Sequence, residues 1–276
     1  MRRLSRVFIL VFIFYSPEIF SQELYVFSEP ASNMPAKSIS FKLSGKFPVD
    51  GYNNRTYQRY TPEVMLGISK RVMVHLTGSF SDYYSENVRP ESIRGYVKYR
   101  FLSNDEVHRH FRMAAFAEGS YSRSPIIFEE MTFEGDNSGI QAGLIATQLV
   151  NRLAVSGTAS YMRAFRDKEN HIEHYGHSRN MLGYSLSAGY LVLPREYKSF
   201  KQTNFNIYLE ILGNQALNKS EFFVDIAPAI QLIFNSNTKL NFGARIEAGS
   251  NMTRIAKNRF LISMEHTLLN VLKRKR

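Results

Sequence analysis

Three regularly spaced histidines are the part of this sequence best suited to bind a metal ion. His171, His174 and His177 are each separated by two residues. Imidazole nitrogens are good ligands for zinc, copper and nickel, and three of them can converge if this stretch makes a helical turn. Three carboxylates lie nearby, on Asp167, Glu169 and Glu173. The stretch is therefore a candidate zinc or copper site, and the alternative is a solvated polar loop. We expect no other cofactor.

A histidine and a serine on one face of a strand are candidates for a base and a nucleophile. His75 and Ser79 lie in a run that alternates apolar and polar residues, so an extended chain puts both on the polar face. They are four residues apart, which is roughly 13 Å along a strand and too far for a hydrogen bond. His266 falls on the apolar face of its own run, with no serine on that face. We therefore predict no catalytic residue, and a lipid-modifying enzyme is only the third alternative for function.

Charged residues recur at alternate positions in runs whose other residues are apolar. In residues 239–249, apolar side chains alternate with small, polar or charged ones that include Arg245 and Glu247. This period of two gives an extended strand one apolar face and one polar face. Comparable runs place further charges on polar faces. The charged residues predicted to line a lumen are Lys42, Glu63, Arg94, Lys98, Arg112, Glu118, Glu210, Asp225, Arg245, Glu247 and Glu265.

Twelve alternating runs follow one another along the chain. They are residues 38–47, 58–69, 72–81, 92–101, 111–122, 140–150, 153–165, 181–193, 203–213, 222–234, 239–249 and 258–269. The connections after odd-numbered runs are long, whereas 70–71, 151–152 and 235–238 are tight turns. The connections 102–110 and 194–202 are longer than this scheme expects. The pattern predicts an all-β fold, a transmembrane antiparallel up-and-down β-barrel of about 12 strands, with both chain ends on the short-turn side.

Over about residues 38–270 this pattern resembles that of Gram-negative outer-membrane β-barrel proteins. The resemblance is one of strand number, alternation and loop length, and no single motif carries it. It implies an outer-membrane location, with apolar side chains toward lipid, polar ones toward a wet lumen, and the short turns in the periplasm. It also implies outer-membrane lipid and the barrel assembly machinery as partners. Two features depart from the class, which usually ends on an aromatic residue: this sequence ends Lys-Arg-Lys-Arg and contains no Trp.

The two ends of the chain are expected to lie outside the barrel domain. Residues 1–21 combine three arginines with a nine-residue apolar run, which predicts a secretory signal peptide cleaved near Ser21. Residues 22–37 contain an apolar patch and two prolines, which make a poor strand. We interpret them as a periplasmic lead-in segment, with a piece folded into the lumen as the alternative. Residues 271–276 form a basic C-terminal tail after the barrel at 38–270.

Composition narrows the chemistry further. The formal net charge is +11, but the bases are spread over many runs and do not form a nucleic-acid-binding cluster, so we exclude nucleic acid as a partner. There is no cysteine, which excludes disulfides, a thiolate nucleophile and cysteine-ligated metals.

Two functions are compatible with a charged lumen. Bases dominate the early strands, including Arg94 and Lys98, while acids such as Asp225 and Glu247 dominate the late ones. If these walls face each other across an open gap, the protein is a porin that passes small polar or charged solutes through a transverse field. If the charges pair and close the lumen, the barrel is a surface binding or structural protein that acts through its external loops. A soluble periplasmic barrel or sandwich is the alternative fold.

Overall fold

The structure is a computed structural model that describes residues 25–50, 55–107, 109–165, 178–196, 199 and 201–273. Three features expected from the sequence lie outside these ranges. They are the signal peptide, the histidines at 171, 174 and 177, and residues 274–276 of the basic tail.

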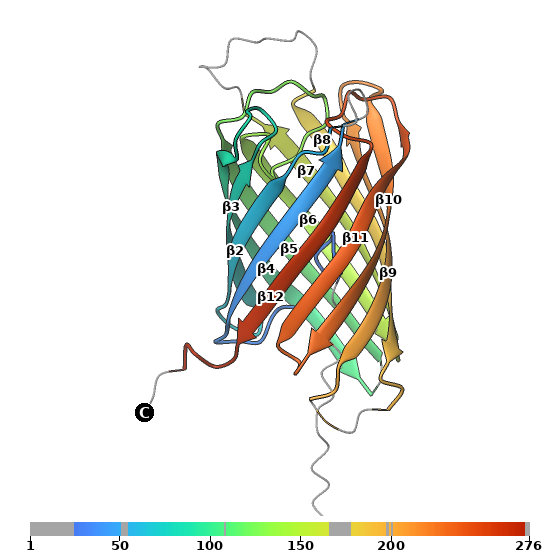
Figure 1. The fold of residues 1–276 in the computed structure, drawn as a ribbon. Coiled ribbons are helices and arrows are strands. Elements are labelled where there is room, and N and C mark those ends of the chain that lie inside the picture. The colour runs from blue at the N-terminus through green and yellow to red at the C-terminus, as the bar shows by residue number, and fades with distance from the viewer. Residues whose placement is uncertain are drawn as a thin grey trace, which may run out of the picture.

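Twelve strands form one closed antiparallel barrel (Figure 1), as the sequence predicted. Each strand pairs with its neighbours in the chain, and β1 closes the ring by pairing with β12. The strands are β1 (Ile39–Val49), β2 (Arg59–Gly67), β3 (Val72–Ser81), β4 (Arg89–Glu106), β5 (Arg109–Ser122), β6 (Gly139–Val150), β7 (Leu153–Ala164), β8 (Asn180–Leu193), β9 (Asn204–Ala216), β10 (Phe222–Phe234), β11 (Thr238–Ser250) and β12 (Asn258–Leu268).

The barrel has two distinct ends. At the terminal end, β1 begins and β12 finishes, and the chain makes tight turns such as the one between β6 and β7. At the opposite end, here the loop end, the chain makes longer connections that include residues 123–138 and 251–257. The described residues contain no helix long and apolar enough to span a membrane.

The period-two pattern is reflected directly in the exposure of the side chains. On β9, Leu209 points outward and is 52% exposed, whereas the next residue, Glu210, points inward and is fully buried. On β4, outward Val97 is exposed and inward Lys98 is buried. The outer surface of the barrel is therefore apolar and its inner wall polar, the reverse of a water-soluble protein.

The connection predicted at 102–110 is wrong. Strand β4 continues to Glu106 and β5 begins at Arg109, so only two residues separate them. A β-bulge lies between Arg100 and Leu102, after which the two strands keep pairing to the hairpin. The residues beyond the bulge are mostly polar on both faces and lack the alternation used to find strands. The backbone hydrogen bonds of a ladder do not require that alternation.

The periplasmic lead-in predicted for residues 22–37 is also wrong for the part that the structure describes. Residues 25–33, here the luminal segment, lie inside the barrel and bond to inward side chains of β4, β6 and β9. The segment leaves the lumen past β2, where Lys37 donates a backbone hydrogen bond to Gly67. Its backbone groups have no ladder partner, so they are satisfied by polar groups of the wall.

Candidate functional site

Glu210 binds the start of the luminal segment through its backbone. Its Oε1 accepts hydrogen bonds from the N–H groups of Val26 and Phe27 at 3.0 and 2.9 Å. Its Oε2 accepts from the N–H of Ser28 at 2.9 Å and from the hydroxyl of Ser187 at 3.1 Å. Four donors therefore satisfy a carboxylate that has no access to solvent, which is the condition for burying such a charge.

Lys98 binds the middle of the segment from the other side. Its Nζ donates to the carbonyls of Pro30 and Ser32 at 2.6 and 2.9 Å, and to the carboxylate of Glu29 at 3.1 Å. The Lys98 side chain is 0% exposed. In the folded protein these three acceptors therefore replace the water that would otherwise solvate its ammonium group. Thr147 on β6 adds a hydroxyl that accepts from the N–H of Ala31 at 2.8 Å.

These contacts carry the segment across the lumen. β4 and β9 are five places apart in a ring of twelve strands, so Lys98 and Glu210 project from nearly opposite walls. Apolar contacts support the crossing. Tyr25, Val26 and Phe27 pack in a cluster with inward residues of β6, β7, β9, β10 and β12. The luminal segment is therefore a constriction in the part of the barrel nearest the terminal end.

A second constriction lies at the loop end. The connection of residues 123–138 carries four acids, Glu129, Glu130, Glu134 and Asp136. Lys46 on β1 pairs with Glu134 at 2.5 Å, and Arg59 on β2 pairs with Asp136 at 2.5 Å. Because this connection starts from β5 and ends at β6, its contacts with β1 and β2 bring it across the mouth of the barrel.

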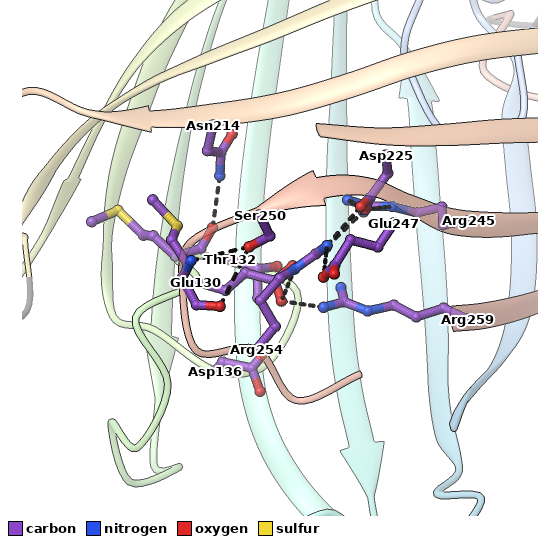
Figure 2. A network of polar contacts seen from close by, with 12 residues as sticks. Glu130, Thr132, Asp136, Asn214, Asp225, Arg245, Glu247, Ser250, Arg254 and Arg259 are labelled. Atoms are coloured by element: carbon purple, nitrogen blue, oxygen red, sulfur yellow. Dashed lines mark hydrogen bonds and ion pairs between the residues drawn. The ribbon is translucent and has the colours of Figure 1, made fainter. Parts of the chain in front are cut away.

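Arg254 joins this connection to the far wall (Figure 2). Its guanidinium contacts Glu130 at 3.2 Å, Asp225 of β10 at 2.6 Å and Glu247 of β11 at 3.2 Å. Arg245 also binds Asp225, at 2.6 Å, and Arg259 binds Glu130. We call these six residues the Arg254 network.

The same connection of residues 123–138 also makes apolar contacts. Met131 and Phe133 are buried in a cluster with residues of β7, β8, β9, β10 and the 251–257 connection. The cluster is rich in methionine, a flexible side chain that fills irregular space. The connection is therefore held in the mouth by ion pairs on one side and by an apolar cluster on the other.

Acid should release this connection. Burial alone would raise the pKa of Glu130, but the guanidiniums of Arg259 and Arg254 outweigh it and hold the pKa below its ordinary value of 4.5. Burial would likewise raise the pKa of Glu134, but the ammonium group of Lys46 outweighs burial and holds that pKa below its ordinary value. A lowered pKa contributes stability above pH 4.5 that is lost as the pH falls through the folded-state value. Hydrogen exchange of residues 123–138, corrected for its intrinsic rate, should accelerate below pH 4 relative to pH 7. Equal acceleration throughout β7 would indicate global unfolding instead.

The other predicted lumen charges are paired with near neighbours. Glu63 contacts His75 at 2.7 Å, Lys239 contacts Glu265 at 2.8 Å, and Arg94 contacts Glu118 at 3.6 Å. Arg112 pairs with Asp105 at 2.8 Å, and Lys42 lies directly across from Glu63 on β2 and Glu265 on β12. These charges are paired locally. This matches neither alternative drawn from the sequence, which were an open transverse field between two walls and pairing between those walls across the lumen.

The residues considered as catalytic candidates, His75, Ser79 and His266, each contact a different residue and do not contact one another. His75 Nδ1 contacts Glu63 and its ring packs against Tyr96, while the hydroxyl of Ser79 donates to Glu91 at 3.2 Å. On the outer face, the imidazole of His266 bonds to the hydroxyl of Thr238 at 2.8 Å. Among the described residues, no group of three or more His, Asp or Glu side chains is placed to hold a metal ion.

Sequence reasoning missed the partners of Lys98 and Glu210. It placed both side chains on the inner wall, but it did not connect them to residues 25–33, more than sixty positions away in the chain. A usable signal was present, because an apolar patch next to two prolines is a poor strand and still requires burial. The four acids at 129–136 were a comparable signal in a chain whose formal net charge is +11.

A closed barrel that is apolar outside and charged within defines the class of this protein as an outer-membrane β-barrel. The loop end is then external and the terminal end periplasmic, because such barrels have long external loops and short periplasmic turns.

Solved structures share this architecture at low sequence identity. The crystal structure of the COG4313 outer membrane channel from Pseudomonas putida F1 is 12% identical, with a TM-score of 0.55, and covers 88% of this chain and 100% of that one. The KdgM porin is 11% identical, with a TM-score of 0.47, and covers 82% of this chain and 98% of that one. No protein-family model and no curated protein matches the sequence. At 12% identity the likeness to the COG4313 channel supports the fold alone.

Proposed function

We propose that the protein is an outer-membrane channel for small polar or charged solutes. The observation that carries this proposal is that the luminal segment is not a member of the sheet. The twelve strands close the ring without it. Its contacts with Glu210, Lys98 and Thr147 are all noncovalent. The segment can therefore leave the lumen without opening the barrel, and it would leave behind a polar wall.

The two constrictions give the channel a closed resting state. The luminal segment narrows the periplasmic part, and residues 123–138 narrow the external mouth. Passage requires at least the luminal segment to move aside. Outer-membrane lipid around the apolar outer face and the barrel assembly machinery are the partners that such a protein requires.

A full-length variant tests the proposal. Val26→Pro and Phe27→Pro remove two of the N–H donors to Glu210, and Glu29→Gln removes the charge that pairs with Lys98. We call this triple substitution the loosened variant. In planar bilayers its single-channel conductance should be clearly larger than that of the wild-type protein, because the segment no longer occupies the lumen. Faster migration of unboiled than boiled protein on a denaturing gel checks that the barrel is folded.

The matched control is Asn33→Ala, which changes one exposed contact between the side chain and the carbonyl of Lys70. It should leave the conductance at the wild-type level. A loosened variant that is folded and inserted but never conducts, even when Arg254→Gln is added to release the external constriction, would refute the channel. The protein would then be a closed barrel that works through its external loops, the alternative raised by the sequence.

A further inference from the structure

The lumen recognises the main chain of its own segment more than its side chains. Six backbone groups of the segment are bound by the wall, four as donors and two as acceptors. They are the N–H groups of Val26, Phe27, Ser28 and Ala31, and the carbonyls of Pro30 and Ser32. These groups are common to every polypeptide. Residues 26–28 bend and turn three successive N–H groups toward one carboxylate, so the same wall positions suit any peptide that can adopt this bend.

We propose that the lumen contains a binding site for short peptides, which the protein's own residues 25–33 occupy at rest. The proposal rests on the proposed channel and names its class of solute as short peptides. The luminal segment is then a tethered occupant that an incoming peptide replaces.

The two ends of the site differ in charge, which gives it a direction. Glu210 accepts from three successive N–H groups, an arrangement that an amide chain or a peptide ammonium group can offer. Lys98 binds a carboxylate together with two carbonyls. A free peptide bound in the same direction presents its N-terminus toward Glu210 and an acidic side chain or its C-terminal carboxylate toward Lys98. A peptide matching residues 26–32 reaches both.

The apolar cluster at the Glu210 end adds a side-chain preference. Tyr25 packs edge-on against Tyr208 with ring centroids 5.9 Å apart, and Phe27 lies against Gly243, where an added Cβ would come within 2.7 Å of its ring. Gly243 therefore leaves room for a large ring at this position. The site should favour aromatic or branched residues near the N-terminus of the peptide and an acidic residue two or three positions later.

The first experiment uses the loosened variant as full-length protein in detergent. A fluorescent synthetic peptide with the sequence of residues 25–33 should bind it, as measured by anisotropy. Binding to wild-type protein should be at least about tenfold weaker, because the tethered segment competes from the same chain. A matched peptide that carries the three substitutions of the loosened variant should not bind.

A fourth substitution locates the binding. Adding Glu210→Gln to the loosened variant should weaken peptide binding about tenfold or more, since hydrogen bonds to a charged acceptor lose that charge. If the gel shows that this protein is not folded, Thr147→Val takes its place. It removes the acceptor for Ala31 together with one hydrogen bond to Ser156, and it leaves the charge of Glu210 in place. A labelled maltotriose serves as a polar solute without amide groups and should not bind.

Three outcomes would overturn the proposal. They are a folded loosened variant that does not bind the peptide, equal binding of maltotriose, and peptide binding that is unaffected by either wall substitution. The result is separable from the channel proposal. Conductance without peptide binding refutes the site alone. Peptide binding without conductance, in a loosened variant that also carries Arg254→Gln to release the external constriction, refutes the channel and leaves a peptide-binding barrel.

Discussion

Replacing Leu209 with arginine is expected to destabilise the barrel, lowering its free energy of unfolding by about 2–4 kcal/mol. Leu209 lies near the middle of β9 on the outer face and is 52% exposed on the isolated barrel. In the membrane this exposure is contact with hydrocarbon, so the guanidinium either loses its water or deforms the bilayer to keep it. Urea titration of protein folded into phospholipid vesicles measures the change.

The control is Thr158→Arg, at a similar height on the inner wall of β7. Thr158 shares its face with the buried Ser156 and Ser160, so the new guanidinium enters a polar interior. The loss there should be well below that of Leu209→Arg. Equal losses at the two positions would mean that the assignment of inner and outer faces is incorrect.

The sequence predicted the barrel because strand faces are a local property. In a closed ring each strand has one apolar side and one polar side, and this alternation can be read from ten residues without knowing their partners. Leu209 and Glu210 were therefore assigned to opposite faces correctly. The same method failed beyond Leu102, where polar residues occupy both faces of β4 and carry no alternating signal.

Partners across the lumen could not be predicted in this way. The contact between Val26 and Glu210 joins residues 184 positions apart, and no periodicity relates them. Pro30 and Pro35 correctly argued against a ladder strand, but they do not specify where a non-strand segment is buried. Strand order similarly placed bases opposite acids, yet it could not show that residues 123–138 bring their own acids to Lys46 and Arg59.

The acidic connection gives the lumen charges a structural role at the mouth. Asp225 and Glu247 were expected to line the lumen, and both contact Arg254, which belongs to the 251–257 connection. Arg254 in turn reaches Glu130. Charges on β10 and β11 are thus used to hold two connections over the external opening. Solutes can enter at this end only if the contacts of Arg254 with Glu130, Asp225 and Glu247 are broken.

Arg254→Gln should release the external constriction. Arg254 is 2% exposed at its side chain and is shared by Glu130, Asp225 and Glu247. Removing one partner of a buried ionic group is costly, on the order of 3–5 kcal/mol, because the remaining charges stay buried without compensation. Arg245 and Arg259 still neutralise part of that charge. We therefore expect residues 123–138 and 251–257 to move into water, because this solvates the remaining charge without breaking the strand ladder. The strands keep their ladder and the barrel stays folded.

Two measurements report this release. Limited proteolysis should cut within residues 123–138 much faster in Arg254→Gln than in the wild-type protein, and conductance of the loosened variant should rise further when Arg254→Gln is added. The matched control is Lys257→Gln on the same connection. Lys257 is 71% exposed and lies 3.9 Å from Glu247, so its pairing is worth little in water. If Arg254→Gln and Lys257→Gln behave alike while both barrels remain folded, the Arg254 network does not hold the mouth, and the apolar cluster around Met131 and Phe133 is sufficient to keep the connection in place.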